Sequence, residues 1–327
     1  MGPPPPRLSL RHALALGLAH GPTELLPISS SAHTILIPLL AGWPYGELDP
    51  ELRKSFEVAL HAGTAAALLV DLRSLESHPV LRALLERLGA RSPHPPARGE
   101  TPENSPADAA SAQYPAPLPA TGPSELPARR ALLVVALSFL PPAIVGYTFE
   151  QPLQRRLSGP TTIVAGLLLG GAAMMLADAR AADGTRPLEQ ASAFDGLLLG
   201  LAQTCSLVPG VSRSGAVLTA ARARGFGRAD SSTLARRTGL PVIVGAGALK
   251  TGRLLQRGAA SGAPIPGGRA LLLGGGASFL STLVATRVLR RNRGTQHAAA
   301  LWPYALYRGL LSACVGRRLR EAHNKNG

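Results

Sequence analysis

Polar side chains interrupt a mostly apolar run near the start of the chain. Between Ala13 and Leu40 the sequence contains Glu24, three consecutive serines at 29–31, and His33. A carboxylate, hydroxyls and an imidazole are groups that proteins use for proton transfer and nucleophilic attack. Because polar groups are costly in an apolar setting, their joint occurrence indicates a reactive site.

The helices on either side of a turn must bring these groups together. Pro27 has no amide hydrogen, so we expect a helix to break near it. The serines at 29–31 are good N-cap residues for a new helix that begins around Ala32. The N-terminus of such a helix presents free N–H groups and a positive dipole end, which favour an anion. Glu24 would lie before the break and His33 in the first turn after it.

A second segment repeats this arrangement. Pro209 and Gly210 are expected to break another helix, and Ser212 and Ser214 can cap the next one, with Arg213 between them. Arginine matches phosphate through a planar bidentate fork, and an arginine within a membrane segment is a candidate functional residue. The two turns together predict a phosphate-binding pocket with acid–base groups beside it.

Each of these residues also has a purely structural interpretation. The serines could only cap a helix, Glu24 could form a structural ion pair with Arg213, and His33 could be a satisfied core histidine. The occurrence of all four residue types at two matched breaks favours the functional interpretation.

The two broken segments resemble each other in sequence. "GLAHGPTELLPISSSA" (17–32) can be aligned with "GLAQTCSLVPGVSRSGA" (200–216) with one gap. Paired, interrupted hydrophobic segments are typical of an internal repeat with discontinuous helices. Irregular backbone at membrane depth is tolerated where it is buried in protein or lines a cavity. Chance similarity between segments rich in Gly, Ala and Leu is the alternative.

The composition is that of a membrane protein. Of 327 residues, 46% are apolar and 16% are charged, below the charged content of an ordinary soluble domain. Two uncharged runs, 131–149 and 159–177, are long enough to span a bilayer. The alternative is a soluble all-α protein with buried helices. Further candidate spans lie at 56–70, 238–249, 270–286 and 298–316.

A formal net charge of +15 could suggest a nucleic-acid partner. The arginines, however, occur in short clusters between apolar runs, such as 222–228 and 287–293, as in loops attracted to anionic lipid. We therefore expect no nucleic-acid binding. Cys205 and Cys314 imply neither a disulfide framework nor a metal cluster.

A polar, proline-rich segment divides the chain, which we interpret as a single membrane domain, 1–327. The segment cannot bury enough apolar surface to fold alone. The predicted parts are a first repeat part (1–88), a disordered loop insertion (89–130), the remaining spans (131–316) with a second re-entrant segment (194–226), and a basic tail (317–327).

Two motifs of the sequence resemble those of a known family. "GPTELLPISSSAH" and "LVPGVSRSGA" are similar to the two signature motifs of the undecaprenyl-diphosphate phosphatases, the bacitracin-resistance membrane phosphatases. "SFEVALHAGTAAALLV" (55–70), "LPPAIVGYTFE" (140–150) and "WPYALYRGLL" (302–311) also look like family segments, so the resemblance covers most of the chain.

The resemblance implies an all-α integral membrane protein with about six transmembrane helices and two re-entrant helix pairs, arranged as an inverted repeat. It implies a multi-pass protein of the bacterial inner membrane with its site toward the outer face. The implied activity is hydrolysis of undecaprenyl diphosphate to the monophosphate, which recycles the lipid carrier of cell-wall synthesis. A divalent metal ion, Mg²⁺ or Ca²⁺, is the implied cofactor.

The resemblance also assigns roles to residues. By motif position, the catalytic residues are Glu24, Ser30, His33 and Arg213. The substrate-binding residues are Ser29, Ser31, Ser212, Ser214 and, again, Arg213. The metal-binding positions are Glu24 and His20.

The chain departs from the family pattern at three positions. His20 stands where the family usually has the first Glu or Gln of its acidic motif, which affects metal binding most, because Mg²⁺ prefers oxygen ligands. His20 could instead act as a base. Ala32 replaces a glycine, and Val217 replaces a threonine, with Thr219 two residues further on.

Our mechanistic hypothesis is phosphoryl transfer at the membrane interface. Arg213 and helix N-terminal amides would hold the diphosphate, Ser30 would attack phosphorus or orient a water, and His33 would be general base or acid. Glu24 would orient the histidine or bind the metal. The sequence leaves the nucleophile open between Ser30, His33 and water.

Three other functions are compatible with the sequence: a transporter or flippase of an isoprenyl phosphate lipid that uses the same anion pocket, a binding-only relative, and a soluble nucleic-acid binder. The expected partners are a polyprenyl diphosphate lipid and membrane lipids. The oligomeric state is open, with a homodimer as one arrangement.

Overall fold

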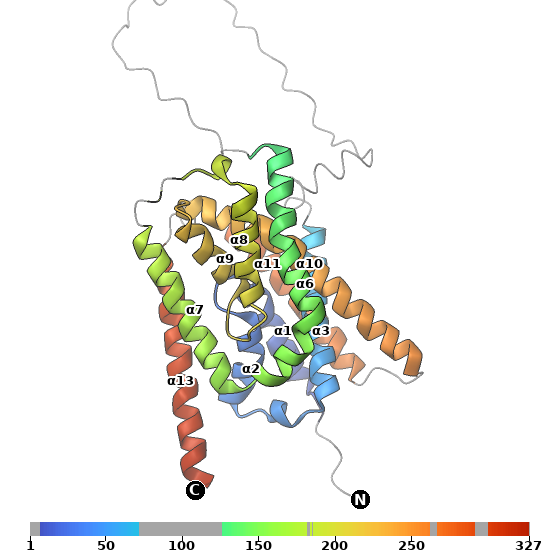
Figure 1. Cartoon of the computed structure of the whole chain (residues 1–327). Coiled ribbons are helices and arrows are strands. Elements are labelled where there is room, and N and C mark those ends of the chain that lie inside the picture. Colours follow the sequence, from blue (N-terminus) through green and yellow to red (C-terminus); the bar gives the residue numbers. More distant parts are fainter. Residues whose placement is uncertain are drawn as a thin grey trace, which may run out of the picture.

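The chain folds into a bundle of α-helices (Figure 1). The structure is a computed structural model that describes residues 7–71, 126–181, 184, 186–261, 267–291 and 300–326. Within these ranges, backbone pairing outside the helices and turns is limited to an isolated bridge between Arg186 and Phe226. The predicted all-α fold class is therefore confirmed.

Two pairs of consecutive short helices are each followed by longer helices. The elements are, in chain order, α1 (Leu10–Leu25), α2 (Ser30–Ala41), the 3₁₀ turn η1 (Pro44–Glu47), α3 (Pro50–Val70), α6 (Ala128–Leu157), α7 (Pro160–Arg180), the 3₁₀ turn η2 (Leu188–Gln190), α8 (Ala193–Cys205), α9 (Arg213–Ala223), α10 (Arg228–Ser261), α11 (Gly268–Arg291) and α13 (Trp302–Asn326).

Among the described residues, three segments are long and apolar enough to cross a membrane: Ala128–Phe149, Pro160–Arg180 and Gly268–Arg291. They match the predicted spans at 131–149, 159–177 and 270–286. Their outward faces are apolar, with Leu169 71% exposed on α7 and Leu272 79% exposed on α11. Such faces suit lipid rather than water. The chain is thus an all-α membrane protein, and the total of about six spans stays a prediction.

The packing of the helices has an approximate twofold pattern. α1 packs on α11 as α8 packs on α6, and α3 contacts α11 as α10 contacts α6. Likewise, α2 contacts α13 as α9 contacts α7, while α3 contacts α10 and α7 lies beside α13 (Figure 1). The two halves of the pattern correspond helix by helix: α1 to α8, α2 to α9, α3 to α10, α11 to α6, and α13 to α7. This is the arrangement that an internal repeat predicts.

Glycines allow the broken helices to approach their neighbours closely. A Cβ atom on Gly17 of α1 would lie 2.4 Å from the carbonyl oxygen of Gly274 in α11. A Cβ atom on Gly196 of α8 would lie 2.6 Å from the carbonyl oxygen of Val134 in α6. Small residues at such contacts are typical of helix packing in membranes, where van der Waals contact replaces the hydrophobic drive. α1 and α8 are thereby held in equivalent settings.

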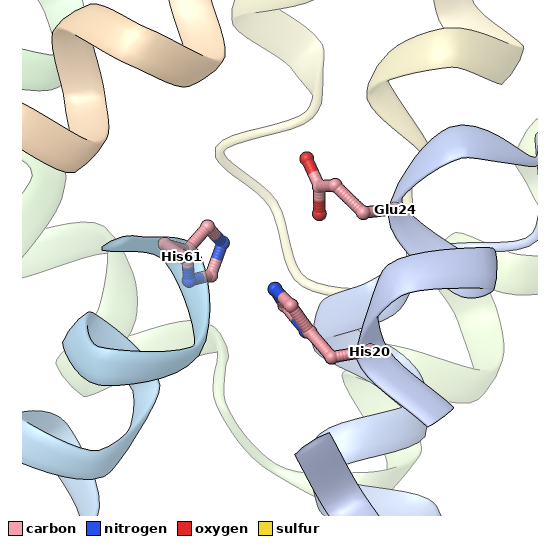
Figure 2. Close-up of side chains that lie close together, drawn as sticks. All are labelled: His20, Glu24 and His61. Atoms are coloured by element: carbon pink, nitrogen blue, oxygen red, sulfur yellow. The ribbon is translucent and has the colours of Figure 1, made fainter. Parts of the chain in front are cut away.

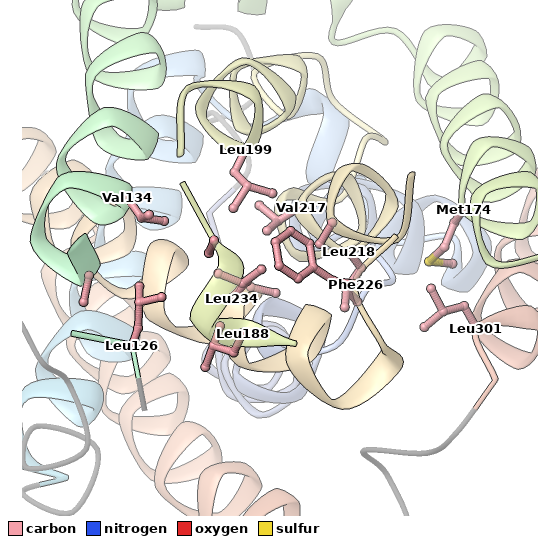
Figure 3. Close-up of a cluster of buried hydrophobic side chains, with 14 of the residues drawn as sticks. Leu126, Val134, Met174, Leu188, Leu199, Val217, Leu218, Phe226, Leu234 and Leu301 are labelled. Carbon is pink, nitrogen blue, oxygen red and sulfur yellow. The ribbon is translucent and has the colours of Figure 1, made fainter. Parts of the chain in front are cut away.

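The largest apolar cluster supports the second broken pair (Figure 3). Leu199 of α8, Val217 of α9 and Leu234 of α10 are buried there against Val134 of α6. Val217 is fully buried, so the residue that replaces the family's threonine fills core space. This cluster fixes the position of the α8–α9 turn relative to α10.

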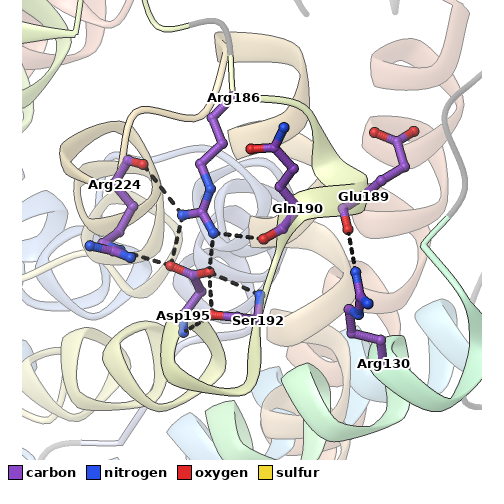
Figure 4. Close-up of polar contacts among 7 residues, drawn as sticks. All are labelled: Arg130, Arg186, Glu189, Gln190, Ser192, Asp195 and Arg224. Atoms are coloured by element: carbon purple, nitrogen blue, oxygen red, sulfur yellow. Dashed lines mark hydrogen bonds and ion pairs between the residues drawn. The ribbon is translucent and has the colours of Figure 1, made fainter.

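A buried carboxylate organises the end of the bundle near α8 (Figure 4). Asp195 is fully buried and accepts hydrogen bonds from Arg186 at 2.6 Å and 3.0 Å and from Arg224 at 2.7 Å. It also completes a capping box with Ser192 at the start of α8. The side chain of Asp195 thus pairs with both arginines and also caps the N-terminus of α8.

This network corrects one sequence interpretation. The arginine cluster at 222–228 was expected to face anionic lipid. Instead, Arg222 is buried and donates to Asp178 at 2.9 Å, and Arg228 donates to the same carboxylate at 2.9 Å. Arg224 pairs with Asp195. The sequence does not reveal these pairs, because the carboxylates that neutralise the arginines lie far from them in the chain.

Two predicted boundaries differ from the structure. The loop predicted at 89–130 ends earlier, because α6 begins at Ala128 and Leu126 is already buried; residues 72–125 lie outside the described part. The basic tail predicted at 317–327 continues the helix, since α13 reaches Asn326. Arginines are good helix formers, so the helix does not end where the apolar run ends.

Candidate active site

The first broken helix pair turns sharply at Ser29. α1 ends at Leu25, and α2 begins at Ser30 rather than near Ala32. Ser29 has φ of +73°, the one non-glycine residue with positive φ among those the structure describes. Such a backbone is strained for a residue with a side chain. Sterically unfavourable backbone of this kind often occurs at functional sites.

The serines of this turn do not cap the helix as predicted. Ser29 occupies the N-cap position but its side chain makes no capping hydrogen bond. Its Oγ lies 3.3 Å from Oγ of Ser31 instead. The first N–H groups of α2 therefore have no side-chain cap. These groups are suited to an anion.

The second turn is built differently. Gly210 supplies the positive φ, +95°, and a Cβ there would lie 2.3 Å from the carbonyl oxygen of Ile163. Ser212 caps α9 as predicted, since its side chain accepts from the amide of Gly215 at 3.2 Å. Arg213 and Ser214 are the first residues of the helix, so both project from its N-terminal turn.

The two turns meet through direct polar contacts. Arg213 Nη2 donates to Glu24 Oε1 at 2.8 Å. The other oxygen of Glu24 accepts a short hydrogen bond from Ser30 Oγ. Ser214 Oγ donates to the carbonyl oxygen of Leu26 at 3.0 Å. A serine hydroxyl, a carboxylate and a guanidinium thus form one connected chain across the two halves of the sequence.

This ion pair is largely shielded from solvent. The side chains of Arg213 and Glu24 are 14% and 8% exposed. Gly239 of α10 makes space for the guanidinium, because a Cβ atom there would lie 2.5 Å from Arg213 Nη1. Electrostatic interactions are stronger in such a setting than in water, so any anion that reaches Arg213 is bound more strongly than at the surface.

His33 is held in one tautomer. Its Nδ1 lies 2.7 Å from the carbonyl oxygen of Ser29, which can only accept, so Nδ1 carries the hydrogen. The neutral ring then has an acceptor at Nε2, which lies 2.6 Å from the hydroxyl of Tyr307 on α13. The two rings also stack, with an interplanar angle of 1°. His33 is therefore oriented by the strained turn and by α13.

A buried arginine braces the second turn from behind. Arg308 of α13 is 1% exposed and donates to the carbonyl oxygens of Gly166, Leu167 and Gly210, each at 3.0 Å. Among the described residues, no carboxylate pairs with this cation. The three carbonyl oxygens stabilise it instead. The brace holds the Gly210 turn against α7.

Two further side chains, His20 and His61, converge with Glu24 on one point (Figure 2). His20 and Glu24 are four residues apart on α1, and His61 approaches them from α3. One ligand atom from each lies within 4.8 Å of the others. His20 is 2% exposed, and neither of its ring nitrogens has a hydrogen-bond partner among the described residues.

The chain is similar to known proteins over most of its length. A family model described as "Bacitracin resistance protein BacA" matches residues 13–314. The chain belongs to this family. It is 33% identical over 305 residues to a protein of Geobacter metallireducens named undecaprenyl-diphosphatase, which covers 93% of this chain and 96% of the relative. A protein of the same name from Geobacter sulfurreducens is 32% identical over 312 residues, covering 94% and 97%.

A third relative, from Trichlorobacter lovleyi, carries the same name. It is 32% identical over 303 residues, which cover 92% of this chain and 94% of the relative. The predicted family is therefore confirmed over nearly the whole length of the chain. The roles of individual residues within this BacA-family site stay predictions.

The metal ion expected for the family can be tested against the residues present. The donors beside Glu24 are two imidazoles and one carboxylate. Mg²⁺ and Ca²⁺ prefer sites made of oxygen ligands, whereas imidazole suits Zn²⁺ and other transition metals. The residues of this chain therefore do not fit Mg²⁺ or Ca²⁺ well. His20, unlike the usual acidic residue, supplies nitrogen.

The structure brings together most of the residues that the sequence singled out. Glu24, Ser30 and Arg213 are hydrogen bonded directly. In the same two turns, Ser214 donates to the carbonyl oxygen of Leu26, and Ser212 lies within hydrogen-bond distance of Ser214. The carbonyl oxygen of Ser29 accepts from His33, and Oγ of Ser29 lies 3.3 Å from Oγ of Ser31. Glu24 contacts Ser30 and Arg213 rather than orienting His33, which bonds to Tyr307.

Sequence reasoning missed Tyr307, Arg308 and His61. Tyr307 and Arg308 lie in "WPYALYRGLL" and His61 in "SFEVALHAG", both noted as family-like segments. A lone aromatic or histidine on an apolar helix gives no sign of its partner. Only the pairing of His20 with His61 in space, with ring centroids 4.8 Å apart, makes the second histidine conspicuous.

Proposed function

We propose that the protein hydrolyses undecaprenyl diphosphate to undecaprenyl phosphate and inorganic phosphate. The observation that carries the proposal is the hydrogen-bonded chain from Ser30 through Glu24 to Arg213. It unites a nucleophile, a proton acceptor and a phosphate-binding cation at the meeting point of two helix N-termini. Membership of the BacA family and the names of the relatives support the same activity.

The substrate's diphosphate binds between the two turns. Arg213 forms two hydrogen bonds to the terminal phosphate when it exchanges part of its contact with Glu24 for phosphate oxygens. The uncapped N–H groups at the start of α2 bind the remaining oxygens. Ser212 and the serines at 29 and 31 line the same turns. In phosphoryl transfer, positioning and charge stabilisation of this kind supply most of the catalysis.

Ser30 is the nucleophile in this proposal. Its hydroxyl already donates to Glu24, so the carboxylate can take the proton as Oγ attacks the terminal phosphorus. The bond from phosphorus to the bridging oxygen breaks, and undecaprenyl phosphate leaves with the electron pair. Water then attacks the phosphoserine, releases phosphate and restores the serine.

His33 assists the second step. Its Nε2 is an acceptor, because Nδ1–H is donated to Ser29. It takes the proton of the attacking water through the hydroxyl of Tyr307, which lies 2.6 Å from Nε2. The geometry favours this role over a phosphohistidine, because both ring nitrogens are already engaged. No step of this scheme depends on a metal ion.

We also propose a multi-pass location in the bacterial inner membrane, with the site toward the outer face. The apolar, outward-facing helices and the family membership support a membrane setting. A long isoprenyl chain can remain in the bilayer while its charged end reaches the turns. A homodimer is compatible with this proposal but is not required by it, because the site is built from one chain.

The test is phosphate release from undecaprenyl diphosphate by the purified protein in detergent. Ser30→Ala should lower kcat by at least about 10³-fold, as removal of a nucleophile does. Ser138→Ala is the matched control, because this serine lies in α6, its hydroxyl donates to Val135 of the same helix, and its backbone bond with Gln203 survives the substitution. Full activity of Ser30→Ala would remove the phosphoserine route.

The rival functions give different results in the same assay. Transport of an isoprenyl phosphate across vesicles without phosphate release would indicate a flippase. Ligand-induced thermal stabilisation without turnover, with hydrolysis restored by His20→Glu, would indicate a binding-only relative.

A further inference from the structure

We propose that His20, His61 and Glu24 form a binding site for a transition-metal ion of the Zn²⁺ class. The residues come from two helices, α1 and α3, and their side chains converge on one point (Figure 2). One ligand atom from each lies within 4.8 Å of the other two, so a modest side-chain movement can place all three around one ion. The position of the metal ion beside the substrate rests on the proposed function. The binding of the metal ion does not.

The first argument is the state of His20. Its ring is almost completely buried, yet neither nitrogen has a hydrogen-bond partner among the described residues. Buried polar groups in proteins are nearly always satisfied, and each exception needs an explanation. An ion that binds one of these nitrogens supplies the missing partner. The ring is aimed at His61 and Glu24, where such an ion would lie.

The second argument is the tautomer of His61. Its Nδ1 lies 2.8 Å from the carbonyl oxygen of Glu57, which can only accept a hydrogen bond. Nδ1 therefore carries the hydrogen, and the lone pair of Nε2 is free to bind a metal. Metal-binding histidines typically donate their second nitrogen to a carbonyl or carboxylate in this way. The backbone of α3 thus holds His61 in the Nδ1–H tautomer, which is the form that can bind a metal through Nε2.

The third argument is the capacity of Glu24. Its two oxygens accept from Arg213 and Ser30, but a carboxylate has about four lone-pair positions. An oxygen of Glu24 can bind the ion without losing both contacts. His20 and Glu24, four residues apart, lie on the same face of α1, which is the spacing that puts two ligands on one ion.

The donor types decide the class of metal. Two imidazoles and one carboxylate match the three-ligand sites of Zn²⁺ that leave a fourth position open. Mg²⁺ and Ca²⁺ would be poorly served by two nitrogens. Because Glu24 also contacts Ser30 and Arg213, the open position would face the turns that bind the diphosphate. A divalent charge there adds to that of Arg213.

The experiment measures metal binding directly. The full-length protein, with any affinity tag removed and with Cys205 and Cys314 changed to serine, is stripped with chelator in detergent. Co²⁺ is then added, and the visible absorption of tetrahedral Co²⁺ is recorded; Zn²⁺ is measured by equilibrium dialysis and elemental analysis. We expect one equivalent of Zn²⁺ or Co²⁺ per chain, which millimolar Mg²⁺ does not displace.

Variants identify the ligands. His20→Ala and His61→Ala should each weaken Zn²⁺ binding by at least 100-fold, and Zn²⁺ should raise the thermal midpoint of the unaltered protein but not of these variants. His12→Ala is the matched control, because His12 also lies on α1 but stacks on Trp43 away from the cluster. A cooperative thermal transition of each variant without metal shows that it has folded.

Two results would overturn the inference: no stoichiometric Zn²⁺ or Co²⁺, or equal binding by the double variant His20→Ala/His61→Ala. Failure of the proposed function is distinguishable from this. Stoichiometric Zn²⁺ without phosphate release would contradict the hydrolase proposal alone, and phosphate release without metal binding would contradict the metal inference alone.

Discussion

Glu24 and Arg213 are 189 positions apart in the sequence, yet their side chains form an ion pair with 2.8 Å between Oε1 and Nη2. Each residue lies at one of the two turns that interrupt the broken helix pairs. Their contact therefore joins the two halves of the repeat at the site where we place the reaction. From sequence alone, an ion pair between these two residues is a purely structural alternative to catalysis. Because Glu24 also accepts a hydrogen bond from Ser30, the same carboxylate holds the two turns together and contacts the proposed nucleophile.

The role of Arg213 is tested by changing its shape and its charge separately. We expect Arg213→Ala to lower kcat/KM by about 10³-fold, because arginines that bind a transferring phosphoryl group are worth that much. Arg213→Lys should recover only part of the loss, since an ammonium cannot form the bidentate fork. The control is Arg318→Ala on the surface of α13, whose side chain is 50% exposed. Equal activity of Arg213→Lys and the unaltered protein would contradict bidentate binding.

The hydroxyl of Tyr307 is expected to matter through His33. Tyr307→Phe removes the partner of His33 Nε2 but keeps the stacked ring. We expect kcat to fall by about 10²-fold with little change in KM, which is the lower end of what general acid–base catalysis contributes. The pH–rate profile should change shape as well. Tyr304→Phe, one helical turn earlier on α13, should have full activity; a loss there as large as at Tyr307 would indicate a structural effect.

Gly239 offers a test of how precisely Arg213 must be placed. A methyl group at this position would lie 2.5 Å from Arg213 Nη1, so Gly239→Ala should push the guanidinium aside. We expect about a tenfold or greater loss in kcat/KM while thermal stability stays the same or rises, because alanine favours helix by about 1 kcal/mol over glycine. Gly252→Ala is on the same helix with no atom within 4 Å of its Cβ, and it should retain full activity.

The carboxylate of Asp195 is expected to determine stability rather than chemistry. Asp195→Ala leaves Arg186 and Arg224 without their shared partner and removes the capping box of α8 (Figure 4). Loss of one member of a buried ion pair costs about 3 kcal/mol or more. We expect a lower thermal midpoint in detergent. At temperatures where the variant is folded, kcat should be nearly normal.

Glu189→Gln serves as the control for this prediction. In the network of Figure 4, Glu189 accepts from Arg130 through its backbone carbonyl, so the substitution leaves that bond intact. An equal loss of stability in both variants would show that the Asp195 network is not the cause.

Much of the fold follows from local sequence. Uncharged runs of span length predict helices α6 and α7, because the bilayer demands apolar residues and internally satisfied backbone. Pro27 and Pro209 predict the two breaks, since proline cannot donate its backbone hydrogen bond. The similarity of 17–32 and 200–216 predicts a repeat, and the paired packing of the helices has that pattern.

The sequence by itself therefore determined the residue types of the site, the two turns that carry them, and the family. Tertiary structure decided which of those residues touch: Ser30 bonds to Glu24, and His33 bonds to Tyr307 rather than to Glu24. It also decided that His20 faces His61, and that the arginines at 222–228 pair with the buried carboxylates of Asp178 and Asp195. The physical reason is the distance along the chain over which each interaction acts. Proline breaks and apolar periodicity act between neighbours in the chain, whereas ion pairs and ligand clusters depend on helices whose packing no single segment specifies.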